Sequence, residues 1–126
     1  MSITADQIRV TAIAQFLPEQ SDPGSDQYVF SYTVRIHNGA EQPVQLLRRH
    51  WWVTCADEVT EVEGEGVVGE QPVIEPGTVY EYSSGTLLPA DSGSMYGTYQ
   101  MVAADGETEL EVEVPRFPLE AYPTVH

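Results

Sequence analysis

Apolar and polar residues alternate along several short runs of the chain, which is the pattern of half-buried β-strands. Over residues 8–16 the even positions are apolar and most odd positions are polar, with Ile13 as the one misfit. The cleanest alternation covers residues 28–37, where every even position carries a bulky apolar side chain. The segment 18–26 is rich in turn residues, and Asn38-Gly39 signals a turn after the second run. These patterns predict two successive strands joined by a surface loop.

A third run, residues 43–55, is apolar on both faces, because Leu46-Leu47 and Trp51-Trp52-Val53 are consecutive. It is therefore predicted to lie centrally in its sheet. Shorter runs separated by turns containing Gly, Pro and Asp follow at residues 59–63, 73–74, 79–83, 95–103 and 110–114. The 3.6-residue period of an amphipathic helix is missing, as are internal repeats. The pattern predicts an all-β sandwich of about seven or eight antiparallel strands with no major helix.

Length and charge narrow the classes of function. A chain of 126 residues fits a single domain, expected here to cover 1–126 with a short flexible tail at about 118–126. Five Arg and no Lys stand against twenty Asp and Glu, for a net charge of −15, which repels phosphate backbones and anionic lipids. We expect no nucleic-acid partner. Solubility is the commonest consequence of such acidity, and attraction of cations or of a basic protein surface is the alternative.

Cellular location follows from what the sequence lacks. Cys55 is the only cysteine, so no internal disulfide is expected, and residues 1–6 contain neither the basic nor the apolar region of a secretion signal. No apolar stretch is long enough to span a bilayer. These features predict a cytoplasmic protein without membrane insertion.

A row of carboxylates is predicted on the last strand. Glu109, Glu111 and Glu113 alternate with three apolar residues, so they should share the solvent-facing side. Such a charged row discourages edge-to-edge pairing with another chain, and this structural reason needs no ligand.

Residues 64–69 spell G-x-G-x-x-G, the motif that binds a pyrophosphate when it joins a strand to a helix. Here Pro72 and Pro76-Gly77 follow, so no helix N-terminus is expected, and nearby glutamates would repel phosphate. We interpret the glycines as a loop between strands that needs positive φ or close backbone approach. A weak phosphate site made of exposed amides is the alternative.

The densest cationic and aromatic cluster is Arg48-Arg49-His50-Trp51-Trp52. Neighbours along a strand face opposite sides. We therefore expect the odd set to face the core, namely Leu47, Trp51, Val53 and Cys55. Arg49 should lie on the same side or at its rim. The even set Arg48, His50, Trp52 and Thr54 should face outward. Trp51 is therefore predicted to be buried and Trp52 more exposed. Trp52 with Arg48 and His50 then forms a candidate contact surface, the alternative being an ordinary solvated strand face.

No arrangement of residues indicates catalysis or a dedicated metal site. The serines do not match the G-x-S-x-G elbow, and His50 has no identifiable acid or nucleophile partner. The C-x-x-C, H-x-x-x-H and calcium-loop spacings do not occur, although Glu61, Glu63 and Glu65 on one strand face could hold a hard cation loosely. We predict a non-enzymatic protein with no catalytic residues, no cofactor and no metal site.

Several of these segments together resemble the bacterial ApaG family, also called CorD, a DUF525-type domain. They span nearly the whole chain: Tyr28-Val29-Phe30, Val44 to Leu47, Arg49-His50-Trp51, Gly64 to Pro72, Ser84-Gly85, Gly93-Ser94-Met95 with Gly97, Tyr99 and Met101, and Pro115, Phe117 and Leu119. The resemblance implies an immunoglobulin-like or fibronectin type III-like sandwich. The family names reflect a genetic neighbourhood with diadenosine tetraphosphate hydrolysis and a link to cobalt and magnesium efflux. Related domains in eukaryotic F-box proteins and in a polymerase-interacting protein imply partner binding, and no enzymatic chemistry is established across the family.

The family pattern falls on a defined set of positions, and any shared site should use some of them: Arg49, His50, Trp51, Gly64, Glu65, Gly66, Gly69, Glu70, Gln71 and Pro72. Trp52 departs from the pattern, where a smaller aliphatic residue is more usual, so an interface built on it would belong to this protein rather than to the family. The leading hypothesis is a module that binds an unidentified protein partner through the glycine loop and the Arg49 to Trp51 region, with an indirect effect on divalent-cation homeostasis. The alternative is direct, weak binding of a divalent cation at the acidic surface, or of a pyrophosphate or nucleotide at the glycine loop.

Overall fold

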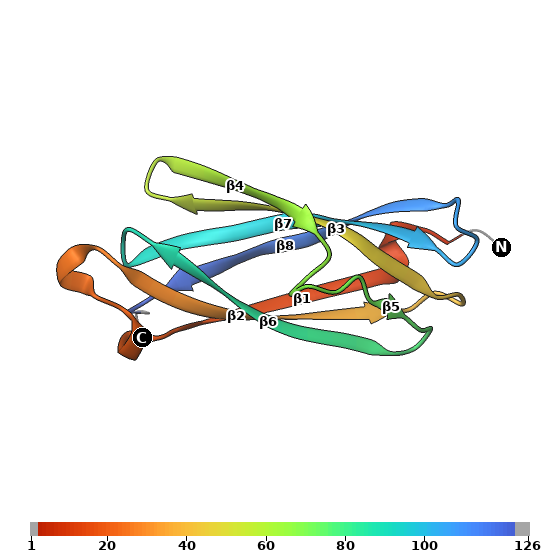
Figure 1. The fold of residues 1–126 in the computed structure, drawn as a ribbon, viewed down its shortest axis with the longest axis horizontal. Coiled ribbons are helices and arrows are strands. Elements are labelled where there is room, and N and C mark those ends of the chain that lie inside the picture. The colour runs from red at the N-terminus through yellow and green to blue at the C-terminus, as the bar shows by residue number, and fades with distance from the viewer. Residues whose placement is uncertain (1–2, 123–126) are drawn as a thin grey trace.

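The computed structural model describes residues 3–122 and consists of two packed antiparallel sheets (Figure 1). The smaller sheet has the order β1-β2-β6, with β1 at Ile8–Phe16, β2 at Tyr28–Asn38 and β6 at Val79–Leu88. The larger sheet has the order β4-β3-β7-β8, and its strands are β3 Val44–Cys55, β4 Glu58–Glu65, β7 Ser92–Ala103 and β8 Glu109–Glu120. The two-residue strand β5, Val73–Ile74, pairs with the start of β3. The predicted all-β sandwich of eight strands is confirmed.

Short 3₁₀ turns are the only helical elements in residues 3–122, and they lie at Ala5–Gln7, Pro18–Gln20 and Pro23–Ser25. No helix in this range is long and apolar enough to cross a membrane.

The core forms where the alternating faces of the two sheets meet. On β2 the even positions Phe30, Val34 and Ile36 are fully buried, and on β1 the even positions Ile8 and Val10 are buried opposite them. The odd position Ile13 is 74% exposed, because period two places it on the outer face whatever its polarity.

A register shift explains why β3 is apolar on both faces. Leu46 is fully buried, and Trp51, Val53 and Cys55 are buried too, although 46 is an even position and the others are odd. The pairing of β3 with β7 shifts between Leu46 and Arg48, and the extra residue of such a bulge reverses which positions face inward. The expectation that Leu47 faces the core is therefore wrong, since it is only partly buried. The central position of β3 in its sheet is confirmed.

The first residues of the predicted flexible tail at 118–126 are packed into the fold. β8 continues to Glu120, Leu119 is fully buried and Ala121 is 7% exposed, while residues 123–126 lie outside the described residues. Pro115 and Pro118 do not end the strand because β8 lies at the edge of its sheet, where a missing N–H is tolerated. A second register shift, between Met95 and Gly97, lies opposite this segment.

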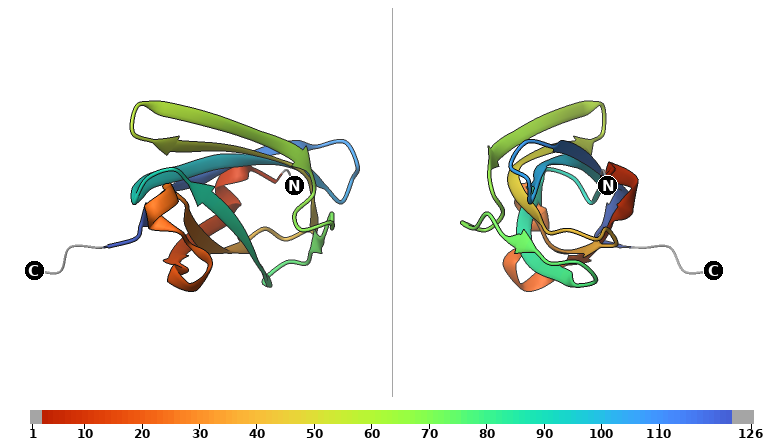
Figure 2. Two further views of the ribbon diagram at one scale, coloured as in Figure 1. Left: turned by 60° about the vertical axis from the view of Figure 1, so that its left-hand side comes forward. Right: turned by 90° about the vertical axis from the view of Figure 1, so that its right-hand side faces the viewer.

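The two sides of the sandwich differ. On one side β1 packs beside β8, so the edges of the two sheets meet. On the other side β4 pairs only with β3, and all its residues except Gly64 are exposed. β4 lies at the top of the molecule, away from the strands of the smaller sheet, in all three views (Figures 1 and 2). The outer face of the larger sheet is thus broad and open.

Candidate binding surface

The outer face of the larger sheet carries the residues predicted to point away from the core. Strand pairing places Trp52 of β3 between Glu61 of β4 and Tyr96 of β7. Trp51, on the opposite face, is 2% exposed, whereas Trp52 is partly exposed. The predicted difference between the two tryptophans is confirmed.

Four planar side chains stack in sequence across this face, and we call them the aromatic ladder: His50, Trp52, Tyr96 and Arg116. The His50 and Trp52 ring centroids lie 3.8 Å apart with planes inclined by 19°, and those of Trp52 and Tyr96 lie 5.4 Å apart at 11°. The guanidinium carbon of Arg116 lies 4.3 Å from the Tyr96 ring centroid. Each aromatic or cation–π contact of this kind contributes roughly 0.5–1.5 kcal/mol.

Both ends of the aromatic ladder are fixed by polar contacts. At one end, His50 Nδ1 lies 3.1 Å from Glu63 Oε1, and His50 Nε2 lies 3.2 Å from Glu61 Oε2. At the other end, Arg116 Nη1 donates to Ser94 Oγ at 2.5 Å and to Thr54 Oγ1 at 3.2 Å. The ladder is therefore ordered before any partner arrives.

A hollow of about 310 Å³ lies beside the aromatic ladder. Its lining combines two aromatic rings, a hydroxyl, a carboxylate, a proline and a guanidinium: Trp52, Tyr96, Thr98, Glu113, Pro115 and Arg116. The exposed side chain of Arg48 lies on the same sheet face, since it follows the parity of His50 and Trp52.

Sequence reasoning missed Tyr96 and Arg116, which complete the aromatic ladder. The alternation within residues 95–103 predicts that Tyr96 lies on the opposite face from the buried Met95, but it does not say which residue of another strand it meets. That information is in the β3–β7 register, where Tyr96 pairs with Trp52. Arg116 follows a register shift in β8, so simple parity does not place it either.

The glycine loop, residues 64–72, is built around Arg49. Arg49 Nη1 donates to the carbonyl oxygens of Glu65 at 3.1 Å and Gly66 at 2.9 Å. The guanidinium lies against Gly64, where an added Cβ would come within 2.7 Å of Nη2. Gly66 has a φ of +65°, and a Cβ there would collide with the carbonyl oxygen of Glu70. Close approach and positive φ explain these two glycines, as the sequence predicts.

The amides of the glycine loop are largely engaged within the protein. Those of Gly66, Val67 and Glu70 donate to the carbonyl oxygens of Leu47, Glu70 and Val67 respectively. The side chain of Gln71 also donates to Leu47 O, at 3.0 Å. An anion at this loop would have to compete with these carbonyl groups, and two of the loop's own carbonyls already accept from Arg49.

The structure brings Arg49 together with the glycine loop but separates His50 and Trp51 from it. His50 lies on the outer face, Trp51 in the core, and Arg49 beneath the glycine loop with Gly64, Glu65 and Gly66. Gly69 lies in the exposed turn at the loop tip, and Glu70 accepts a hydrogen bond from the Tyr80 hydroxyl at 3.0 Å. The set divides into one surface residue, one core residue and one loop.

A buried group of tyrosines lies between the sheets next to Arg49. The hydroxyls of Tyr82 on β6 and Tyr99 on β7 are 2.5 Å apart, which joins the two sheets. Burial raises the pKa of both phenols and of Tyr32, and the positive charge of Arg49 opposes part of that rise. These groups stay protonated at neutral pH and do not supply a base.

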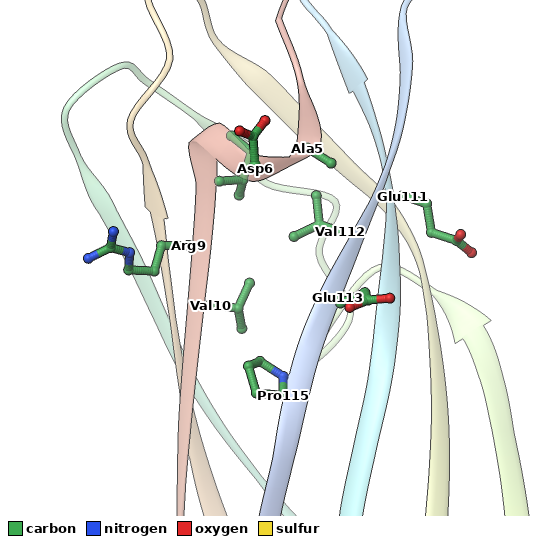
Figure 3. A pocket seen from close by; sticks show the side chains of 9 residues that line it. Ala5, Asp6, Arg9, Val10, Glu111, Val112, Glu113 and Pro115 are labelled. Carbon is green, nitrogen blue, oxygen red and sulfur yellow. The ribbon is translucent and has the colours of Figure 1, made fainter.

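A second hollow, of about 450 Å³, lies at the seam between β1 and β8 (Figure 3). Its lining combines apolar and charged residues (Figure 3): Ala5, Ile8, Val10, Val112 and Pro115 with Asp6, Arg9, Glu111 and Glu113. The seam hollow is therefore mixed in character, and Glu113 lines both this hollow and the one beside the aromatic ladder. Within residues 3–122 no group of three or more His, Cys, Asp or Glu side chains is placed to hold a metal ion.

Comparisons with known proteins identify the family. The model of the ApaG domain matches residues 18–103. Protein ApaG of Dechloromonas aromatica is 50% identical over 121 residues, covering 95% of this chain and 94% of the relative, and Protein ApaG of Pseudomonas aeruginosa is 46% identical over the full length of both chains. The crystal structure of a putative ApaA protein from Bordetella pertussis superposes with a TM-score of 0.88 at 45% identity, covering 93% and 95% of the two chains. The chain belongs to the ApaG family.

Proposed function

We propose that the protein is a non-enzymatic protein-binding module whose binding surface is the outer face of the β4-β3-β7-β8 sheet. The observation that carries this proposal is the aromatic ladder. Trp, Tyr and Arg are the residues that most often dominate the energy of protein interfaces. Here one of each lies on an open sheet face: Trp52 and Tyr96 are stacked on each other, and Arg116 lies over Tyr96 and donates to two hydroxyls.

Preorganisation of the aromatic ladder favours binding. A surface side chain that becomes ordered on association costs about 0.5–1.5 kcal/mol. Trp52 is stacked between neighbours on β3 and β7, and Arg116 is hydrogen-bonded to two hydroxyls. Much of that cost is therefore met during folding, which is a reason to place the partner here.

In this proposal the glycine loop supports the fold more than it contacts the partner. Arg49 is occupied by loop carbonyls, and Trp51 is buried. His50 is the one residue of the Arg49 to Trp51 region on the binding surface. Any effect of the protein on cobalt and magnesium efflux would be indirect and would arise through its partner.

Site-specific photo-crosslinking tests the surface. A photoreactive residue at Gln100, which is exposed on the outer face of the larger sheet, should capture one or a few proteins in cells that express the protein. The matched position is Gln15, exposed on β1 in the other sheet. Adding Trp52→Ala should abolish the Gln100 adducts, whereas Ile13→Ala, which removes an exposed apolar side chain elsewhere, should leave them intact. Identical adducts at Gln100 and Gln15, or adducts that survive Trp52→Ala, would contradict the proposal.

Direct binding of a small ligand is the rival function. Acidic side chains flank His50 and offer oxygen ligands to a cation, while the free amides at the glycine-loop tip are the remaining donors for a phosphate. Calorimetry with cobalt, magnesium and diadenosine tetraphosphate distinguishes cation binding, nucleotide binding and protein binding. Heat from a cation favours the acidic rows and heat from the nucleotide favours the loop. The protein-binding proposal expects heat from none of them.

A further inference from the structure

The hollow beside the aromatic ladder has the chemistry of a receptor for one particular side chain. We infer that it receives an arginine of the partner, so that the partner docks through a basic segment. This inference rests on the proposed function and names the partner chemistry for that same surface.

Glu113 supplies a carboxylate at one end of the hollow. It lies across from Thr98 in the β7–β8 register, and it lines this hollow as well as the hollow at the β1–β8 seam. The ion pairs found within residues 3–122 involve Glu61, Glu63 and Glu81 and leave Glu113 unpaired. A carboxylate beside two aromatic rings is thus available to an incoming cation.

The position of Arg116 determines which end of the hollow the partner's arginine can occupy. Its guanidinium occupies the Tyr96 end of the hollow and is held there by Ser94 and Thr54. A second cation is repelled from that end, so the partner's arginine is directed to the Thr98 and Glu113 end. There it can lie against the ladder while it pairs with the carboxylate.

Arginine fits this site better than lysine. A guanidinium is planar, stacks on aromatic rings and bonds a carboxylate through two parallel N–H groups, whereas an ammonium is a compact, strongly hydrated charge. The contact between Arg116 and Tyr96 shows that a guanidinium already packs against this ladder at 4.3 Å. The partner's arginine would repeat an arrangement that the sheet face supports.

Charge around the hollow favours a basic segment. Carboxylates flank the ladder on both sides, with Glu61 and Glu63 on β4 and Glu111 and Glu113 on β8. The net charge of −15 attracts basic partners over a longer range. A segment that crosses the strands with an arginine at its centre meets acidic side chains at both ends.

Titration of the isotope-labelled protein with defined peptides tests the inference. The probes are an oligoarginine peptide, an oligolysine peptide of equal length and an oligoglutamate peptide. We expect the arginine peptide to shift the indole N–H of Trp52 and the amides of Thr98 and Glu113, and to bind more tightly than the lysine peptide. Glu113→Gln should weaken arginine binding by roughly three- to fivefold, the range of an exposed ion pair. Glu109→Gln removes the same charge from the same strand outside the hollow and should change it much less.

The outcomes separate this inference from the proposed function. Equal affinity for arginine and lysine, shifts spread over the whole acidic surface, or an effect of Glu109→Gln as large as that of Glu113→Gln would overturn arginine recognition. If no peptide binds while the Gln100 adducts remain sensitive to Trp52→Ala, the outer face is a binding surface for other chemistry and only this inference fails. If those adducts are also absent, both fail.

Discussion

Arg49 illustrates how a single side chain can decide the conformation of a loop. In an acidic chain it is a natural candidate for binding an anion, yet its Nη1 donates to two carbonyl oxygens of the glycine loop. That guanidinium packs directly against Gly64, which has no Cβ to displace it. The first glycine of the G-x-G-x-x-G motif therefore serves an internal arginine.

Gly64→Ala should lower the free energy of unfolding by about 2 kcal/mol, because the new methyl group displaces the Arg49 guanidinium from its carbonyl partners. Urea unfolding measures the change. Gly24→Ala is the control, since a Cβ there meets its nearest neighbour at an ordinary 3.6 Å. Adding Arg49→Met to Gly64→Ala should cost less than the sum of the two single changes, because both remove the same contact. Full additivity would show that the glycine has another role.

Asn38 has a larger role than the turn that its Asn-Gly sequence signals. It is fully buried, and its side-chain amide donates to Gln42 O and Ile74 O at 2.9 Å while its Oδ1 accepts from the amide of Ala40. Asn38→Ala should cost about 3 kcal/mol, because it leaves buried backbone groups without partners. Thr33→Ala, which removes an exposed hydroxyl pair with Ser83, should cost well under 1 kcal/mol. Similar unfolding midpoints for the two variants would contradict this account.

At the scale of the element, β4 is the open edge of the larger sheet. It pairs only with β3 and carries Glu58, Glu61, Glu63 and Glu65, so two copies that met at this edge would bring carboxylates together. β8 is the other edge and has its own predicted glutamate row, but β1 packs alongside it. The need for repulsive charge is therefore greater on β4 than on β8.

Replacing these four β4 glutamates with glutamine should cause concentration-dependent association through the β4 edge, because the repulsion is removed while the unpaired backbone groups remain. Sedimentation velocity over a range of protein concentrations detects it. The matched control replaces four glutamates of β8, Glu109, Glu111, Glu113 and Glu120, which changes the net charge equally. Equal association of both variants would indicate that net charge, not the β4 edge, keeps the chains apart.

The individual strands could be predicted from the sequence better than the contacts between them. Period-two alternation predicted β1 with its observed bounds, because the alternation of apolar and polar positions can be read from the local sequence. It misplaced Leu47, since a bulge is set by pairing with another strand. It found Trp52 but not Tyr96 or Arg116, because contacts across β3, β7 and β8 depend on register between segments far apart in the chain.

At the scale of the whole molecule, a hydroxyl pair joins the sheets. Tyr82 belongs to the smaller sheet and Tyr99 to the larger one, and burial raises the pKa of each above the ordinary value of 10.0. The unfolded chain therefore loses these protons at a lower pH than the folded chain. Their contribution to stability is complete below about pH 10 and is lost as the pH rises above it.

We therefore expect the free energy of unfolding to fall above about pH 10 by about 1.4 kcal/mol per pH unit for each of the two tyrosines. The double variant Tyr82→Phe with Tyr99→Phe should be less stable near neutral pH, because the hydroxyl bond is gone, but its alkaline slope should be shallower. Urea unfolding at a series of alkaline pH values, with tyrosinate absorbance recorded alongside, measures both effects. Tyr122→Phe, which removes a hydroxyl from a side chain that is 62% exposed, should keep the slope of the unmodified chain. An unchanged slope in the double variant would mean that alkaline unfolding starts elsewhere, and the tyrosine pair would then join the sheets without controlling their separation.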